Sequence, residues 1–404
     1  MITFLIIFFT VLALIHGVLS FKKPEAAIGL ILFLLPTYLI RFSVLGIPFT
    51  YLEILLLIFI GITILTRFKK EEFRAFRKLG IVNWVIVLFI FAGIISTLVS
   101  PDKIKALGVL KAFIVEPILF FYTILLTIKR EELIKTPLNF LASSVTLISA
   151  FGFLQYWTFL FLPLRFWGSG EEVLRITSIF EYPNALALFL SPLFIFFLVL
   201  WFKKSVLINR WLLNITLLFS GLSIFLTFSR GAWLSIFLAA AFLLYKFYRP
   251  NKKIILASAI VIILFALLPP VSKRLLLTFN DASSFAHFDL VKVAANKIMS
   301  SPILGNGLWG FRHTLEQSKF TGEILNYPHN IILNFWLELG LLGLLSFFAL
   351  INLSLAEYKK NPTALKLAGA MFLLVMLLHG LVDVPYFKND LSILFWFVIS
   401  LFFI

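Results

Sequence analysis

The feature that most constrains this chain is the repetition of apolar runs of about 20 residues, the length that crosses a lipid bilayer as a helix. We delimit thirteen such segments, at approximately 2–20, 26–45, 49–66, 81–100, 106–128, 138–162, 180–202, 211–228, 231–249, 252–270, 330–355, 364–382 and 388–404. Hydrophobic residues make up 61% of the 404 residues and charged residues 13%. The pattern predicts an all-α fold: a polytopic membrane protein of about 12–13 transmembrane helices, with residues 1–404 forming a single integral membrane domain.

The basic residues indicate how these segments are oriented. Twenty of the 35 Lys and Arg residues fall in the six connections that follow the first, third, fifth, seventh, ninth and eleventh segments. Because these connections all lie on one side of the membrane, the positive-inside tendency makes that side the cytoplasm. The basic residues are dispersed in short blocks between the apolar segments, and membrane orientation is enough to explain the net charge of +16. We therefore exclude nucleic acid as a partner. The chain has no cysteine, which excludes disulfides and thiol catalysis.

The opposite connections must then face outward. They include the 163–179 loop, the break at 229–231, the insert 271–329 and the connection 383–390. The insert is the only long stretch outside the membrane, so we expect an extracytoplasmic loop that serves as a lid or substrate platform. Within it, residues 284–300 have the periodicity of an amphipathic helix.

A histidine stands at the start of the eleventh segment, in Tyr-Pro-His329-Asn330. Asn330, Asn334 and Glu338 follow at steps of four, which places them along one face of a helix. Polar side chains are costly in hydrocarbon, so this face should point into the protein or a wet cavity. Histidine is also the side chain best suited to moving a proton near neutral pH, which makes His329 a candidate general base.

Several arginines on the same side could hold an anion. Arg230 lies in the nearly loopless Ser-Arg-Gly-Ala-Trp connection, where it either clamps a phosphate or reaches the lipid headgroups. Arg175 precedes a Pro-Asn helix start, and Arg274 begins the long insert. Each of these two could contact substrate or be an ordinary surface charge.

The remaining ionisable candidates have equally plausible structural roles. His287 lies in the amphipathic helix of the insert and could be a solvated residue. Glu116 with Lys111, and His379 with Asp383, could be functional groups or structural ion pairs. Two potential ligands on one helix without a third are thin evidence for a metal site, so we expect none. The spacing of Gly305, Gly307 and Gly310 indicates a turn rather than a nucleotide-binding loop.

Four motifs together resemble the O-antigen ligase and O-antigen polymerase superfamily. They are SRGAW at 229–233, SPILGNGLWGF at 301–311, HNIILNFWLELGLLG at 329–343 and HGLVDVPYFKND at 379–390. The resemblance covers approximately residues 170–390 as a motif-bearing core. Members of this superfamily are multi-pass proteins with a long periplasmic loop just ahead of the His-Asn helix.

The resemblance implies an inverting, metal-independent glycosyl transfer of the GT-C type that uses no cofactor. The donor would be a glycan on undecaprenyl pyrophosphate, and the acceptor would be a hydroxyl of another glycan or of a lipid. His329 matches the residue that positions or deprotonates the acceptor, and Arg230 matches a pyrophosphate ligand. Many relatives carry a further arginine where this sequence has His287, so the second phosphate ligand could be Arg274, Arg175 or His287 itself.

We therefore expect a polysaccharide ligase or polymerase in a bacterial plasma membrane, surrounded by membrane lipids, with its site on the periplasmic side. The sequence does not separate ligase from polymerase, since the two differ only in the acceptor. A transporter or permease of a small anion or sugar is the alternative of a different class. A non-catalytic scaffold, in which His329 would be dispensable, is the third.

Overall fold

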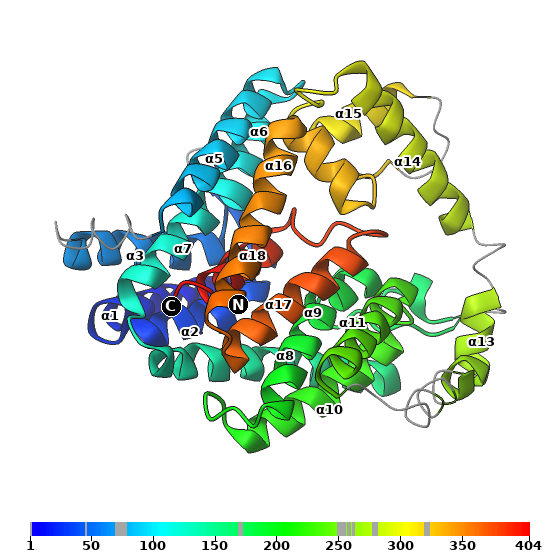
Figure 1. Cartoon of the computed structure of the whole chain (residues 1–404), viewed down its shortest axis with the longest axis horizontal. Helices are drawn as coiled ribbons and strands as arrows, with labels where there is room; N and C mark the ends of the chain where they lie inside the picture. The colour runs from blue at the N-terminus through cyan, green and yellow to red at the C-terminus, as the bar shows by residue number, and fades with distance from the viewer. Residues whose placement is uncertain are drawn as a thin grey trace.

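The computed structural model describes residues 2–44, 47–68, 79–168, 173–248, 256, 260, 263–276, 282–318 and 324–404. Over these residues the protein consists mainly of α-helices packed side by side (Figure 1). Seven of the described helices are long and apolar enough to cross a bilayer, and there are four shorter apolar helices. The predicted all-α polytopic membrane fold is confirmed.

The elements of the first part of the chain are α1 (Ile2–Lys22), α2 (Pro24–Phe33), the 3-10 turn η1 (Leu35–Leu39), β1 (Arg41–Val44), β2 (Ile47–Thr50), α3 (Tyr51–Arg67), α5 (Ile81–Val99), α6 (Lys103–Val109), the π-helical turn η2 (Leu110–Val115), α7 (Glu116–Thr127), η3 (Glu131–Ile134) and α8 (Lys135–Thr158). They continue with η4 (Leu164–Phe166), α9 (Pro183–Phe202), α10 (Arg210–Leu226), α11 (Arg230–Tyr248), α13 (Pro269–Leu276), α14 (Ala282–Ser300), α15 (Gly310–Gln317), α16 (Ile331–Lys360), α17 (Ala364–His379) and α18 (Asn389–Ser400).

Helices that are distant in sequence pack in pairs. The most extensive pairs are α9 with α17, α8 with α10, α5 with α16, α2 with α8 and α7 with α18. One apolar core, rich in Phe, Leu and Ile, runs through these pairs. Helix α17, which ends at His379, contacts both α11 and α16 (Figure 1).

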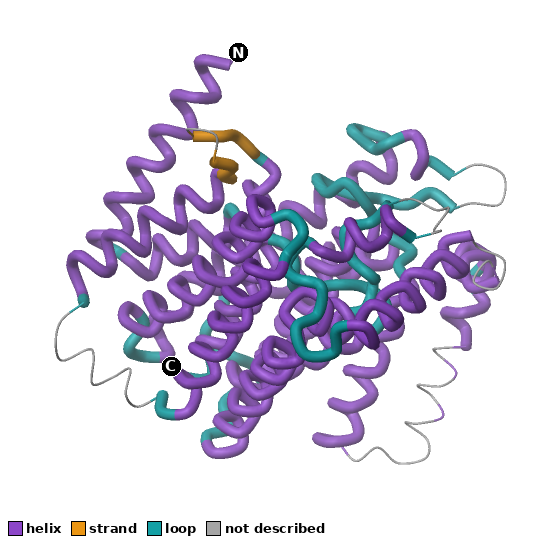
Figure 2. Tube along the Cα trace, turned by 90° about the horizontal axis from the view of Figure 1, so that it is seen from above, coloured by secondary structure: helices purple, strands orange, loops and turns teal. Residues whose placement is uncertain are grey.

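The second apolar segment, predicted to be one helix over 26–45, is divided in the structure. Helix α2 ends at Phe33, and the strands β1 and β2 form an antiparallel hairpin in which Arg41 pairs with Thr50. Pro36 lacks the backbone N–H that would continue the α-helix, and the β-branched and aromatic residues after it favour extended backbone. The hairpin, orange in Figure 2, leads directly into α3, which packs against α1.

The long insert carries helices of its own. Leu290, Ala294 and Ile298 recur every four residues along α14 and form a small second core with residues of α15 and α16. Figure 1 shows α14 and α15 beside the first half of α16. The stretch 284–300, for which the periodicity predicts a helix, lies within α14.

The SPILGNGLWGF segment, residues 301–311, folds against a break in α16. Gly340 has φ 67°, outside the helical region, and a Cβ at this position would collide with the carbonyl oxygen of Ile303. The Leu341 amide donates to that same oxygen at 2.9 Å, and the Asn306 amide donates to Leu337 O at 2.7 Å. Only glycine allows two backbones to approach this closely at a positive φ.

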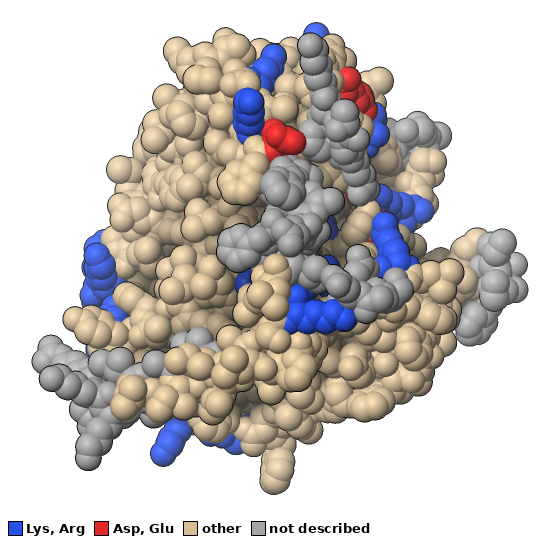
Figure 3. All heavy atoms as spheres, turned by 90° about the vertical axis from the view of Figure 1, so that its right-hand side faces the viewer, with Lys and Arg blue, Asp and Glu red and all other residues tan. Residues whose placement is uncertain are grey.

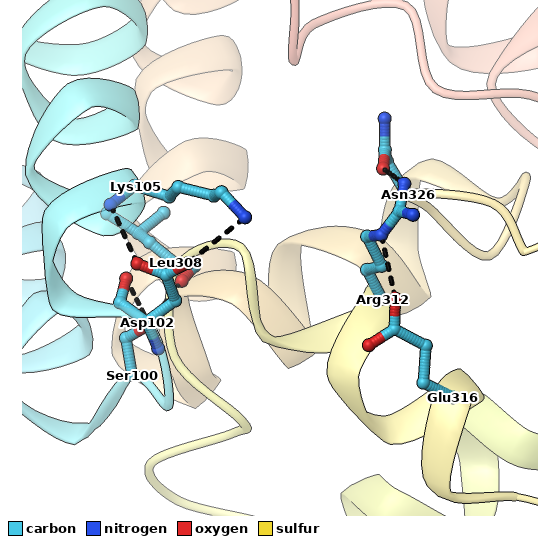
Figure 4. Close-up of polar contacts among 7 residues, drawn as sticks. All are labelled: Ser100, Asp102, Lys105, Leu308, Arg312, Glu316 and Asn326. Carbon is cyan, nitrogen blue, oxygen red and sulfur yellow. Dashed lines mark hydrogen bonds and ion pairs between the residues drawn. The ribbon is translucent and has the colours of Figure 1, made fainter.

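Two side chains fasten the same segment to its neighbours. The carboxylate of Glu338 accepts the backbone N–H of Trp309. The Ser100 hydroxyl, at the end of α5, donates to Leu308 O at 2.7 Å (Figure 4). The 301–311 segment therefore joins α5 to the first half of α16.

Gly340→Ala is expected to destabilise the protein by at least about 2 kcal/mol, because a side chain there meets both a positive φ and the Ile303 carbonyl. Thermal unfolding of the purified protein in detergent measures the effect. Gly61→Ala is the matched control, since a Cβ at Gly61 meets nothing within 4 Å. Equal unfolding midpoints for the two variants would contradict the prediction.

Candidate functional site

The side chain of His329 is held by a carboxylate from another part of the chain. His329 Nδ1 lies 3.1 Å from Asp383 Oδ1, and Asp383 also accepts the Val384 amide at 2.9 Å. Such a carboxylate favours the tautomer with the proton on Nδ1 and leaves Nε2 to accept a proton from elsewhere. The pair is only partly exposed, with 26% of the imidazole and 11% of the carboxyl accessible.

The backbone around His329 is also fixed. His329 itself has φ 50°, a left-handed conformation that is costly for a residue with a side chain. The Asn330 side chain caps α16 by accepting the amides of Ile332 and Leu333, and its Nδ2 donates to Leu381 O at 3.0 Å. The Ile331 amide donates to Gly380 O at 2.7 Å. The start of α16 is thus docked on the 380–383 turn.

The charge of Asp383 is maintained by its neighbours. Burial alone would raise the pKa of this carboxyl group, but its interactions with His329, with His379 and with the Val384 amide lower the pKa to about 2. The carboxyl group is therefore ionised near neutral pH. A carboxylate beside Nδ1–H would stabilise the imidazolium if Nε2 took a proton.

Arg230 is the first residue of α11, whose start packs on the same turn. A Cβ added to the next residue, Gly231, would lie 2.7 Å from Val382 Cγ2 and 3.0 Å from His379 Cδ2. Glycine is needed here because the first turn of α11 packs directly on the end of α17. His329 and Gly231, the residue after Arg230, therefore both contact the five-residue segment 379–383. The N-terminal end of α11 adds the positive end of a helix dipole beside Arg230.

Arg175 is tied to the turn before Arg230. Its Nε donates to Thr227 O at 2.8 Å, and its Nη2 donates to Asn184 Oδ1 at 2.9 Å. Its guanidinium thus links the beginning of α9 to the end of α10, three residues from Arg230. The structure brings Arg175 to the candidate site, where it orients the Ser-Arg-Gly turn.

The polar residues predicted along α16 have separate roles. Asn330 caps the helix, Glu338 holds the 301–311 segment, and Asn334 is fully buried between them. His379 is also buried, and its Nδ1 lies 3.0 Å from the Ser191 hydroxyl. Asp383, four residues after His379, forms its ion pair with His329.

The other predicted residues belong to elements for which no contact with His329 is described. Arg274 is half-buried in α13, and the segment leading into α13 packs against α11 through Phe265 and Trp233, whose ring centroids are 5.2 Å apart. His287 belongs to α14, and its side chain falls outside the described residues. Lys111 forms its ion pair with Glu53, at 3.1 Å, and Glu116 is buried within interaction range of both.

Sequence reasoning missed three residues that support this site or its surroundings. Ser191 bonds His379, and Glu53 pairs with Lys111 from 58 positions away. Gln155 accepts the amides of Thr177 and Ser178 at 2.9 Å each, which anchors the strand-like segment carrying Arg175 in the core. Each is a polar residue inside an apolar helix, and that placement is the one signal that could have singled them out.

The chemistry of the site is that of fixed positive charge beside a proton acceptor. Within the described ranges, no three His, Asp or Glu side chains lie together as a metal-ligand set would. Figure 3 shows the face that carries α13 and α14, where coloured Lys and Arg atoms predominate over Asp and Glu. Such a site attracts anions.

A family model described as O-Antigen ligase matches residues 215–348. This match supports the predicted resemblance to the O-antigen ligase and polymerase superfamily. The matched region begins in α10, includes Arg230, the insert and His329, and ends in α16. A search of curated proteins gave no match to the chain.

The match supports a membrane protein that acts in glycosyl transfer of the O-antigen ligase or polymerase type, with lipid-linked glycans as substrates. The family match stops at residue 348, so it does not include the 379–383 segment. The starts of α11 and of α16 nevertheless both pack on this segment.

Asp383→Asn is expected to leave the fold intact and to lower turnover at least tenfold, because the neutral amide no longer stabilises an imidazolium at His329. Its effect on stability should depend on pH. A carboxyl group whose pKa is lowered to about 2 on folding stabilises the protein above its unfolded pKa, and that contribution is lost as the pH falls towards 2. Wild type should exceed the variant by about 2 kcal/mol at neutral pH, and thermal unfolding should show this difference vanishing between about pH 4 and pH 2.

Proposed function

We propose that this protein transfers a glycan from undecaprenyl pyrophosphate to a hydroxyl of an acceptor glycan or lipid, at the outer face of a bacterial plasma membrane. The observation that supports this most directly is the meeting of two segments on residues 379–383. Gly231, the residue after Arg230, packs there from the first turn of α11, and His329 is hydrogen-bonded there from the start of α16. One bound molecule could thus contact a permanent cation and a titratable imidazole.

The proposed reaction needs no nucleotide and no metal. His329 Nε2 takes the proton of the acceptor hydroxyl, and the oxygen attacks the anomeric carbon on the face opposite the pyrophosphate, which inverts its configuration. The bond between that carbon and the phosphate oxygen breaks, and undecaprenyl pyrophosphate leaves with the electron pair. Arg230 stabilises the negative charge that grows on the leaving group, with the N-terminus of α11 behind it. Arg175 holds the turn in place.

The outer location rests on the distribution of charge along the chain. The six connections that hold twenty of the 35 basic residues alternate with those that carry Arg230, His329 and Asp383. The lipid tail of the donor would lie among the helices, with its diphosphate at the depth of the outer headgroups.

Reconstitution tests the proposal. The purified protein in lipid nanodiscs receives an undecaprenyl-pyrophosphate glycan and a set of candidate acceptors, and release of undecaprenyl pyrophosphate is measured together with the elongated or ligated product. Release that depends on acceptor supports the assignment, and the acceptor used distinguishes a ligase from a polymerase. Uptake of a free sugar or anion into sealed vesicles, without any transfer, would instead identify a transporter.

A further inference from the structure

A cavity lies between the β1–β2 hairpin, α6 and the 301–311 segment, and His329 is not part of its lining. Its volume of about 330 Å³ is within the range of small-ligand sites, which is roughly 300–1,000 Å³. Lys111, which the sequence singles out and the proposed transfer does not use, lies in its wall. The cavity is therefore a site whose purpose the reaction at His329 leaves unexplained.

Aromatic rings form much of the wall. Tyr38, Phe42, Phe49, Phe113 and Trp309 come from the hairpin region, from η2 and from the 301–311 segment. Flat rings of this kind bind the C–H faces of sugar rings, which are apolar, and they do so with little loss of conformational freedom.

Polar groups occur at defined places among these rings. Lys111 Nζ lies 3.1 Å from Glu53 Oε1, 3.0 Å from Pro48 O and 3.9 Å from the centre of the Phe49 ring. Asn389 Nδ2 and Thr50 Oγ1 are 3.5 Å apart, the outer limit of a hydrogen bond, so both retain capacity for a ligand hydroxyl. An acyl chain packed against these polar groups would offer them no hydrogen-bond partner.

Basic side chains stand at the edge of the cavity. Arg41 is exposed at the start of β1, and Lys105 is exposed on α6, where it pairs with Asp102 at 3.2 Å (Figure 4). Both are long hydrogen-bond donors that could reach hydroxyl or carboxylate oxygens of a chain entering the cavity. The combination of rings inside and donors outside fits a saccharide better than an acyl chain.

A layer of aromatic side chains connects the cavity with His329. Trp309, in the cavity wall, packs edge-on against Tyr327 with ring centroids 6.2 Å apart, and Tyr327 precedes His329 by two residues. Phe387, in the loop that carries Asp383, lies 5.8 Å from Tyr327 and 6.4 Å from Phe113, again between ring centroids. Trp309 and Phe113 of the cavity wall are therefore joined by ring contacts to residues that flank His329 and Asp383.

We propose that this cavity binds the saccharide chain of the acceptor, at a distance from its reacting hydroxyl. The inference depends on the proposed function for the identity of the reaction, but the cavity and its lining stand independently of it. The site would hold the acceptor while its terminal hydroxyl reaches His329, and it would select acceptors by the sugars that fit against the rings.

Two substitutions test the site, one by filling the cavity and the other by removing part of its wall. Gly108, on α6, lines the cavity, and a Cβ there meets nothing within 4 Å, so Gly108→Phe is chosen to place a ring in the cavity. Phe42→Ala removes one ring of the wall, where Phe42 is 40% exposed. The matched controls are Gly61→Phe, which also has open space, and Phe161→Ala, whose ring is 81% exposed outside the cavity.

The binding probe is the oligosaccharide mixture released by mild acid from the surface polysaccharide of the producing bacterium. Saturation-transfer NMR detects its contact with the protein in nanodiscs, without any need for turnover. We expect Gly108→Phe to abolish the signal and Phe42→Ala to weaken it, whereas both controls should resemble wild type. In the transfer assay, Gly108→Phe and Phe42→Ala should raise the KM for acceptor about tenfold, and kcat and the KM for donor should be nearly unchanged.

The outcomes separate the two proposals. Failure of wild type to transfer any glycan would remove the proposed function, whereas the NMR measurement would still decide whether the cavity binds saccharide. Active transfer with an unchanged signal and an unchanged acceptor KM in both variants would overturn the acceptor site alone. Co-purified phospholipid that Gly108→Phe displaces, with saccharide contact unaffected, would identify a lipid site and also overturn it.

Discussion

Replacing His329 with alanine should reduce glycan transfer at least about hundredfold, the usual contribution of a general base. The imidazole is partly exposed and is oriented by Asp383, and alanine leaves no group to accept the hydroxyl proton. The fold should survive, because Asn330 still caps α16 and the Ile331 amide still bonds Gly380. The measurement is the rate of undecaprenyl pyrophosphate release at saturating donor and acceptor, with unfolding temperature as the check on integrity.

His313→Ala provides the control for that experiment. His313 is an exposed histidine in α15, bonded to Gln317, and belongs to the same insert. Its replacement should leave turnover unchanged. Near-normal transfer by His329→Ala would show that the acceptor is deprotonated by another group, and the mechanism proposed above would have to be abandoned.

Replacing Arg230 should cause a loss of comparable size, about 10²–10³ in kcat, because it removes the fixed charge nearest the developing negative charge. Arg230→Lys should recover little of this activity, since an ammonium cannot make the two parallel hydrogen bonds that a guanidinium makes to phosphate oxygens. The effect should appear both in the chemical step and in donor affinity. Single-turnover kinetics with a labelled donor separate the two.

Arg312→Ala is the matched control for Arg230. Arg312 is exposed on α15 and forms an ion pair with Glu316 at 2.9 Å (Figure 4). Its removal changes the net charge by the same amount without touching the 379–383 segment. A similar loss in both variants would indicate a general electrostatic effect on donor binding, and a specific role for Arg230 would then be excluded.

The periodicity of apolar residues predicted most of the helices but not their interruptions. The segments 81–100 and 330–355 correspond closely to α5, Ile81–Val99, and to α16, Ile331–Lys360. The hairpin after α2 was missed because hydropathy is blind to backbone conformation: Phe42 and its neighbours are apolar in a strand as they would be in a helix. Pro36 was the one local sign of a break.

The candidate site was only partly accessible to sequence reasoning. His329 and Asp383 could each be selected as ionisable groups in apolar surroundings, but their pairing across 54 positions is a tertiary contact that spacing does not encode. The pairing of Lys111 with Glu53 is of the same kind. Local spacing suggested Glu116 for Lys111 and His379 for Asp383, because helical neighbours are all that a periodic pattern can reveal.

The break at Gly340 turns the beginning of α16 into a short lever arm. Ten residues, Asn330 to Leu339, separate His329 from the pivot at Gly340, and the helical part from Ile331 to Leu339 is about 13 Å long. Over that length, a rotation of about 10° at the pivot displaces the imidazole end by roughly 2 Å, which is enough to carry it out of reach of a hydroxyl proton. The backbone hydrogen bonds of Ile303 and Trp309 with residues beside Gly340 therefore set the orientation of the proposed base, although they lie at the opposite end of this part of α16.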